Sequence, residues 1–294
     1  MRIVDAHHHL WNLSAVNYPW LMETGVVRFF GDPAPIRRDY LVADLREDAS
    51  GYELSGSVHI QVGAAAGQEL RETAVVQSMS DEHDLPSAIV AFCDLSADNA
   101  EHILREQLAF PAVRGIRQIV GRSVKEDASS GTDRLIDDER WQSGLGLLEK
   151  FGLSFDLQLI PPQIARIAEV LADHPQLSVA LCHCGSPWDQ SPEGLASWRR
   201  GIELLAAMPN VYCKISGLSM FDHHWTIGSI QPIVEACIES FGADRCMFGS
   251  NFPVDKLHKT YLEIWQAYEQ ITAGLSDTEK ADLFGDTARR FYRI

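Results

Sequence analysis

Residues 3–11 read IVDAHHHLW, a short apolar run that ends in three consecutive histidines. Side chains alternate between the two faces of a β-strand, so we expect Asp5, His7 and His9 on one face and His8 on the other. Two imidazoles that converge at the end of a first strand form a site for a divalent metal ion or a polarised carbonyl. The alternative, a histidine tag, is disfavoured because apolar residues flank the histidines on both sides.

Length and charge limit the classes of function. The chain has 294 residues, of which 46% are hydrophobic, and its formal net charge is −16. One α/β barrel needs about 250 residues, so we expect a single domain over residues 1–294. The negative charge repels phosphate backbones and anionic membranes. We therefore expect a small-molecule substrate and neither nucleic acid nor membrane as partner, with a homodimer as an open alternative.

The chain also carries indications of its compartment. We see no signal sequence at its start and no apolar run near the roughly 18 residues of a membrane span. Its cysteines lie mostly in apolar runs, which suits buried free thiols in a reducing compartment. They are Cys93, Cys182, Cys184, Cys213, Cys237 and Cys246. The sequence therefore predicts a cytoplasmic protein.

Short β-branched runs alternate with longer segments of helical period. The expected strands are 2–6, 57–62, 88–94, 113–117, 154–158, 178–183, 211–215 and 245–249. The expected helices are 38–48, 65–83, 97–109, 138–151, 161–173, 193–207, 226–241, 258–272 and a terminal one at 276–292, which Ser276 and Glu279 cap. This order predicts an α/β fold, a (β/α)8 TIM barrel with an extra C-terminal helix. A doubly wound open sheet is the alternative, although no Gly-x-Gly-x-x-Gly follows the first strand.

Three irregular stretches, 11–37, 119–137 and 184–192, follow expected strands. In a barrel they would lie over the carboxyl-terminal face, where active sites form. Their aromatic side chains either wall a substrate pocket or pack the loops onto the barrel mouth. We take Trp20 and Trp188 as candidate substrate contacts.

Polar side chains collect at the ends of the expected strands. Beyond the first strand they are His59, Gln61, Asp94, Arg114, Arg117, Asp156, Gln158, His183, Lys214, Ser216, Ser250 and Asn251. Apolar side chains fill a barrel core, so this many polar groups exceed what packing requires. In Cys182-His183-Cys184 the ring and the thiols point opposite ways if the strand extends that far, which argues against a Cys-His-Cys metal site.

Six motifs occur in order along the chain. They are Asp5-x-His7-x-His9 with Trp11, Tyr18-Pro19-Trp20-Leu21, Val113-Arg114-Gly115-Ile116-Arg117, His183-x-Gly185-x-Pro187, Lys214-x-Ser216-Gly217 and Met247-Phe248-Gly249-Ser250-Asn251-x-Pro253. This set resembles the lactonase branch of the amidohydrolase superfamily, which includes L-fuconolactonase-like and 2-pyrone-4,6-dicarboxylate lactonase-like enzymes. The resemblance implies a TIM barrel, hydrolysis of a lactone ring, and a site built from the His-x-His pair, His183 and an acid after the eighth strand.

The chain departs from that branch at the last position, where Asn251 stands in place of the usual Asp. A neutral amide cannot take a proton from water and can only orient water or substrate. Asp255 is the nearest carboxylate and is our candidate for the displaced base, with His183 and His7 as competitors.

The sequence leaves two alternatives for metal binding. His7, His9 and His183 can hold Zn²⁺ in an open site, but the loss of an anionic ligand weakens the affinity. The resemblance does not decide the matter, because lactone hydrolysis in this branch does not always depend on a metal. We therefore expect either one divalent metal ion or a metal-independent site.

The leading hypothesis is hydrolysis of a small polar lactone. His7 and His9, or their metal, polarise the carbonyl, and His183 and Asn251 orient the attacking water. One alternative is a metal-dependent decarboxylase of an unsaturated or aromatic acid. Another is a barrel that binds a ligand without turnover, which Asn251 motivates.

Further side chains are candidates for binding the substrate. Arg117 and Lys214 would hold its anionic groups, and Gln61 would add a polar contact. Ordinary ion pairing with Asp or Glu is the alternative role for both cations.

Overall fold

Eight parallel strands form one sheet in the computed structural model, which describes residues 1–294 apart from the side chains of residues 129 and 133. The strands are β1 (Arg2–His8), β2 (Glu53–Ile60), β3 (Ala88–Ala91), β4 (Val113–Ile116), β5 (Ser154–Leu157), β6 (Val179–Leu181), β7 (Val211–Ile215) and β8 (Cys246–Phe248). Their spatial order follows the chain without reversal. The (β/α)8 TIM barrel is therefore confirmed, and the doubly wound alternative is wrong.

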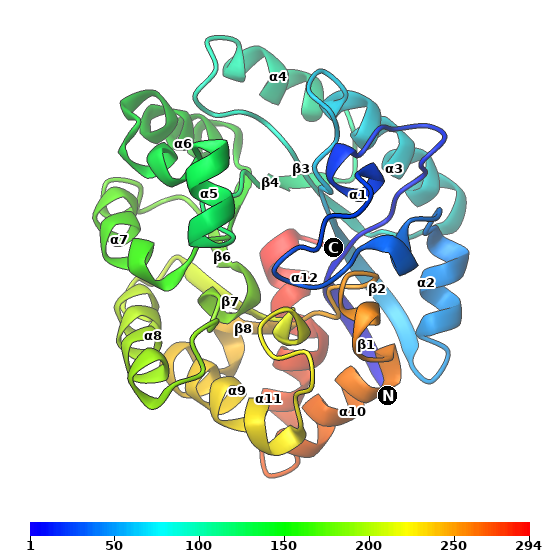
Figure 1. Ribbon diagram of the computed structural model, residues 1–294, viewed down its shortest axis with the longest axis vertical. Helices are drawn as coiled ribbons and strands as arrows, with labels where there is room; N and C mark the ends of the chain where they lie inside the picture. The colour runs from blue at the N-terminus through cyan, green and yellow to red at the C-terminus, as the bar shows by residue number, and fades with distance from the viewer.

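Helices alternate with the strands along the chain, and most of them form a ring around the sheet (Figure 1). They are α1 (Pro19–Met22), α2 (Val42–Asp48), α3 (Glu69–His83), α4 (Ala100–Gln107), α5 (Val124–Ser130), α6 (Glu139–Phe151), α7 (Ile164–Ala172), α8 (Pro192–Ala206), α9 (Ile227–Phe241), α10 (Tyr261–Ile271), α11 (Asp277–Ala281) and α12 (Thr287–Tyr292). The expected cap of the terminal segment is confirmed, because Ser276 Oγ accepts a bond from Glu279 N and the Glu279 carboxylate accepts one from Ser276 N.

The first and last strands meet through the residues that follow them. Asn251 N donates to His7 O and His9 N donates to Phe252 O, both at 2.7 Å. Below these bonds, the Asp5 carboxylate accepts bonds from the backbone N and the hydroxyl of Ser250. The barrel is thus closed at the level where the histidines and Asn251 lie, which brings the ends of the first and last strands to one site.

The C-terminal segment covers the opposite end of the barrel. Side chains of β1, β2, β3 and β8 pack inside the barrel with Ala288 and Tyr292 of α12, and Figure 1 shows α12 near the centre of the ring. The Tyr292 hydroxyl donates to Asp156 of β5. The expected terminal helix is interrupted by a π-helical turn at Asp282–Asp286.

Two local departures from regular strands correct the sequence-based expectations. Register shifts interrupt the pairing of β1 with β2 on both sides of Asp5, so simple alternation fails there. The Asp5 carboxylate accepts bonds from Ser250, from the Tyr261 hydroxyl and from the backbone N of His7. The sixth strand ends at Leu181, two residues earlier than predicted, and the parity argument for Cys182–Cys184 does not apply.

The irregular stretches contain more structure than expected. Residues 119–137 include α5 and a 3-10 helix at Thr132–Asp137, and residues 11–37 include α1. All six cysteines are free and buried. No helix in the described part of the chain is long and apolar enough to cross a bilayer.

Candidate active site

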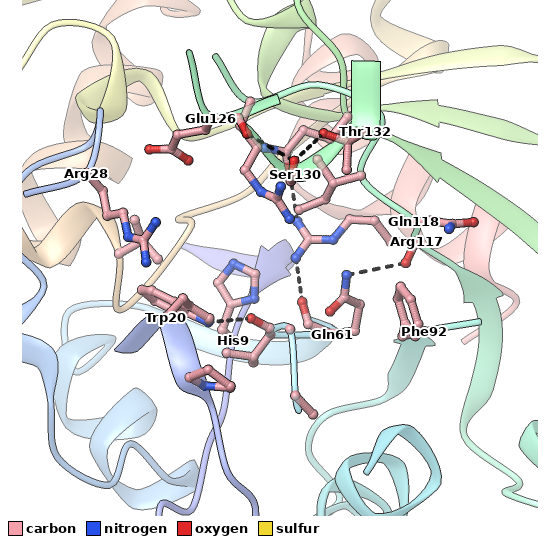
Figure 2. Close-up of a pocket in the computed structure, with 18 of the residues that line it drawn as sticks. His9, Trp20, Arg28, Gln61, Phe92, Arg117, Gln118, Glu126, Ser130 and Thr132 are labelled. Atoms are coloured by element: carbon pink, nitrogen blue, oxygen red, sulfur yellow. Dashed lines mark hydrogen bonds between the residues drawn. The ribbon is translucent and has the colours of Figure 1, made fainter. Parts of the chain in front are cut away.

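A cavity of about 600 Å³ opens at the carboxyl ends of the strands. Residues that directly follow a strand supply much of its floor: His9 after β1, Gln61 after β2, Phe92 after β3, Arg117 after β4 and Gln158 after β5. Figure 2 shows His9, Trp20 and Gln61 on one side of the cavity and Glu126, Ser130 and Thr132 on the other. This is the end of a TIM barrel at which catalytic groups are found.

Three histidines meet at one edge of this cavity. His7 lies between the other two, with ring centroids 5.2 Å from His9 and 4.4 Å from His183. His9 and His183 line the cavity, whereas His7 is fully buried behind them and does not. Neither ring nitrogen of His7 has a hydrogen-bond partner. The expected convergence of the two strand-end histidines on His183 is therefore present.

The three imidazoles are held neutral. Burial lowers the pKa of each ring, to about 3 for His9, and the charge of Arg117 lowers all three further. For His7, the neighbouring rings and Lys214 add to this effect. A neutral imidazole has a lone pair that can take a proton, although a lowered pKa makes it a weaker base.

His183 occupies an unusual backbone position. It follows β6 with a φ of 53°, and Cys184 continues with 56°, so the chain turns sharply off the strand. Such left-handed residues cost free energy and persist where the surroundings fix them, often at functional sites. Here Trp198 Nε1 donates to Cys184 O at 2.6 Å, and Ser186 N donates to His183 O at 2.9 Å. The turn places the ring in the cavity with Nδ1 bonded to Ser216 Oγ at 3.0 Å.

Arg117 is a buried cation with only neutral partners. Its guanidinium donates to Gln158 Oε1 at 3.1 Å and to Gln61 O, and its Nε has no partner. Burial lowers the pKa of the Arg117 side chain. No carboxylate forms an ion pair with Arg117 among the side chains described, so the ordinary ion-pair role is not observed. An anionic ligand in the cavity would relieve this unpaired charge.

Asn251 lies at the surface of the cavity, and Asp255 lies behind it. Asn251 follows β8 with a φ of 56° and lines the cavity. Its amide lies 3.3 Å from His9 Nε2 and 2.7 Å from Asp255 Oδ1. Asp255 is buried behind it, accepts a bond from Ser219 N, and does not line the cavity. Burial raises the pKa of Asp255 to about 7.

Two of the expected substrate contacts lie outside the cavity. Lys214 is fully buried inside the barrel, where its ammonium pairs with Asp156 and lies 4.9 Å from the Tyr292 ring centroid. The ion-pair alternative therefore describes Lys214. Trp188 is 49% exposed and does not line the cavity. Trp20 does line it, with its indole N donating to Val62 O at 2.7 Å.

The sequence reasoning missed several cavity residues. Arg28 and Arg122 belong to the loop stretches already expected to cover the barrel mouth, so a search of those stretches for charged residues would have found them. Glu72 lies on α3 among several other acids, and nothing in the sequence distinguishes it from them. It lines the cavity, accepts a bond from Val62 N, and burial raises its pKa to about 7.

The side chains do not fit a metal ion. Among the residues that the structure describes, no three His, Cys, Asp or Glu side chains are arranged to hold one. Both ring nitrogens of His9 are engaged, Nδ1 by Ile60 O at 2.8 Å and Nε2 by Asn251, and the set lacks an anionic donor. The expected ligand set of His7, His9 and His183 is thus brought together without forming a coordination site, and we derive no step through a metal.

The chain is similar to known proteins over almost its whole length. Residues 4–294 match the sequence profile of a family described as amidohydrolase. The chain is 39% identical to the uncharacterized protein y4mH of Sinorhizobium fredii, over 99% of this chain and 98% of that one. It is 29% identical to an L-fucono-1,5-lactonase of Burkholderia multivorans, over 99% and 96% respectively.

A solved structure extends the likeness to the whole fold. An amidohydrolase from Burkholderia multivorans, with HEPES bound, superposes with a TM-score of 0.84 at 28% identity and full coverage of both chains. A second crystal form of an amidohydrolase from that organism contains zinc and gives a TM-score of 0.83 at 27% identity, again over both whole chains.

Proposed function

This chain belongs to the amidohydrolase family and is a hydrolase, and from that premise we propose that it opens a small lactone that bears an anionic group. The lactonase named among its relatives supports the reaction. The cavity supports the anionic group, because its floor holds a buried cation beside neutral imidazoles.

The unpaired Arg117 guanidinium is the observation that carries the proposal. It lies on the same cavity floor as His9 and His183 and is bonded only to the neutral acceptors of Gln61 and Gln158. Burying a charge without a counter-ion costs several kcal/mol. A site that maintains such a charge facing a cavity is suited to a substrate carboxylate, which supplies the counter-ion on binding.

The proposed chemistry uses His183 as the base. If its Nδ1–H donates to Ser216 Oγ, Nε2 is free to accept a proton from water as the water oxygen bonds to the lactone carbonyl carbon. The tetrahedral intermediate then breaks the ring C–O bond, and the imidazolium returns the proton to the leaving alkoxide. The product is a hydroxy acid, which releases one proton at neutral pH.

Aromatic side chains shape the remainder of the site. Trp11, Trp20, Phe29, Phe30 and Phe92 line the cavity. Rings on the cavity wall exclude water and present flat apolar surface to a small planar ring. A compact lactone with one anionic substituent fits a cavity that is lined by aromatic rings and a buried guanidinium.

A matched screen tests the proposal. Pairs of lactones with and without a carboxylate are supplied to the purified protein, and acid release is followed with a pH indicator. We expect one acid equivalent per lactone and faster turnover, by kcat/KM, of the carboxylated member of each pair. Turnover of neither member, or CO2 release from an unsaturated acid in place of acid release, would overturn the proposal and favour the decarboxylase alternative.

A further inference from the structure

The backbone just beyond strand β2 is bonded to side chains from two other segments. Gln61 N still donates to a neighbouring strand, at Val90 O with a distance of 2.8 Å. The next residue, Val62, has side-chain partners: its N donates to Glu72 Oε1 of α3 at 2.9 Å, and its O accepts from Trp20 Nε1 at 2.7 Å. Both backbone polar groups of this buried residue are thus paired, as burial requires.

Gln61 is bonded to Arg117 in both directions (Figure 2). The Arg117 guanidinium donates to Gln61 O, and Gln61 Nε2 donates to Arg117 O at 3.3 Å. The buried cation and the indole of Trp20 are therefore bonded to adjacent residues, Gln61 and Val62. A movement of this dipeptide changes the position of the guanidinium relative to the indole.

Glu72 also contacts the segment that carries Trp20. Tyr18 lies two residues before Trp20, in the motif at residues 18–21, and its buried hydroxyl interacts with the Glu72 carboxylate. The carboxylate contacts Tyr18 and Val62 N, and Trp20 bonds back to Val62 O, so these contacts form a closed cycle. The indole cannot shift without breaking a member of this cycle, which fixes its place in the cavity wall.

The loop that carries Trp20 is also attached independently of Glu72. Ala65 N donates to Asn17 O, and Asn17 N donates to Gln68 Oε1, both at 2.8 Å. Loss of the Glu72 carboxylate should therefore leave the loop attached. The expected change is local and confined to the indole and the dipeptide that bonds it.

We propose that Glu72 is a positioning residue that sets the spacing between the Trp20 indole and the Arg117 guanidinium. Resting on the proposed lactone hydrolysis, this means that Glu72 fixes the distance between the surface that contacts the lactone ring and the cation that binds its carboxylate. The arrangement requires an acceptor oxygen beside Val62 N and does not require a charge.

The proposed base lies outside this set of bonds. His183 follows β6, and its Nδ1 is bonded to Ser216, not to the dipeptide after β2. Glu72 should therefore act on substrate binding, measured by KM, and much less on kcat.

Kinetics on two variants of Glu72 test the assignment. The substrate is the neutral methyl ester of a carboxylated lactone, so that the charge at residue 72 does not act on a substrate charge. Glu72→Leu removes the acceptor, and KM should rise about 3- to 10-fold, as expected for one lost hydrogen bond, with little change in kcat. Glu72→Gln keeps an acceptor oxygen and should restore the wild-type KM.

Gln77 of the same helix provides the matched control. It is buried, it does not line the cavity, and its Oε1 accepts a bond from Ala112 N at 2.9 Å. Gln77→Leu therefore also removes a side-chain acceptor from a buried backbone N–H. It should lower the free energy of unfolding, as Glu72→Leu does, and leave KM unchanged. An equal rise of KM in both variants would show a general structural effect and overturn the proposal.

Indole N–H NMR tests the arrangement without any substrate. The Trp20 resonance of ¹⁵N-labelled full-length protein, assigned by its absence in Trp20→Phe, reports the bond to Val62 O. We expect it to shift in Glu72→Leu and to keep its wild-type position in Glu72→Gln and Gln77→Leu. Tyr18→Phe removes the other contact of the carboxylate and should shift the resonance by less; this variant decides the matter if Glu72→Leu does not fold.

Two results would contradict the proposal. One is a Trp20 resonance that keeps its wild-type position in both Glu72→Leu and Tyr18→Phe. The other is a loss of about 10²–10⁴ in kcat for Glu72→Gln, the signature of a general acid or base. Absence of lactone turnover by the wild type would instead refute the proposed function, and the NMR measurement would still decide whether Glu72 fixes the indole.

Discussion

Replacing Arg117 by Met removes a buried cation that lines the cavity and has no carboxylate partner among the described side chains. Met keeps most of the aliphatic volume and removes the guanidinium. A hydrogen bond to a charged group contributes about 1.5–3 kcal/mol, so loss of one such contact to a substrate carboxylate should raise KM by roughly 10- to 100-fold. Because a contact remote from the reacting carbonyl acts on ground and transition states alike, kcat should change much less.

The same substitution should affect stability little. It removes two bonds, to Gln61 O and Gln158 Oε1, and it also removes an unpaired buried charge. Loss of the hydrogen bonds destabilises the fold by about 1.5–3 kcal/mol per bond, whereas removal of the unpaired buried charge stabilises it by several kcal/mol. The two effects on the free energy of unfolding therefore oppose each other. Lys214→Met is the matched control, because Lys214 is equally buried but paired with Asp156. It should lower the free energy of unfolding by about 3–5 kcal/mol, since an uncompensated carboxylate remains.

The assay combines steady-state kinetics with urea unfolding. KM is measured for a carboxylated lactone and for its neutral methyl ester, and only the charged substrate should bind more weakly to Arg117→Met. An equal fall in kcat and kcat/KM, with KM unchanged, would place Arg117 on the oxyanion and refute this reasoning. So would an equal effect on the neutral ester.

Three further outcomes follow from the placement of other side chains. His183→Asn should lower kcat by about 10²–10⁴ with a cooperative unfolding transition retained, and near wild-type kcat would remove His183 from the role of base. Trp20→Ala should raise KM, whereas Trp188→Ala, which changes an exposed ring outside the cavity, should leave KM unaltered; the same KM in both would show that Trp20 is not a substrate contact. Burial raises the pKa of Glu72 from its ordinary 4.5 to about 7, so the folded protein holds a proton there that the unfolded chain has released, and the free energy of unfolding should fall as pH rises through this window. Glu72→Gln should reduce that slope in urea titrations at a series of pH values, and an identical slope would show that Glu72 is not its source.

The sequence determined the barrel because its information was local and repeated. Short apolar strands alternate with amphipathic helices in the sequence, and each kind of segment is identified by its own hydrophobic period. This alternation predicts eight strand-helix units, and the strands lie in the sheet in their chain order. Site residues that directly follow a strand, such as His9, Gln61 and Arg117, could also be predicted. All parallel strands end at the same face, so position in the sequence gives position in space.

The tertiary structure decided where the strands depart from regular geometry. Register shifts interrupt β1 on both sides of Asp5, whose carboxylate bonds Ser250, and the left-handed turn at His183 ends β6 early. Both depend on partners from other elements of the fold, namely Ser250, 245 residues from Asp5, and Trp198 of α8, 14 residues after Cys184. No period in the sequence records such long-range bonds.

Tertiary structure also decided which polar groups are free to act. Lys214 and Arg117 are both cations at strand ends, yet Lys214 is neutralised by Asp156 and Arg117 is not. The substitution at residue 251 could be seen in the sequence, but its consequence could not, because it depends on His9 and Asp255 lying on either side of one amide. Charge and hydrogen bonding act over a few ångströms, and only the folded chain sets which groups lie within that range.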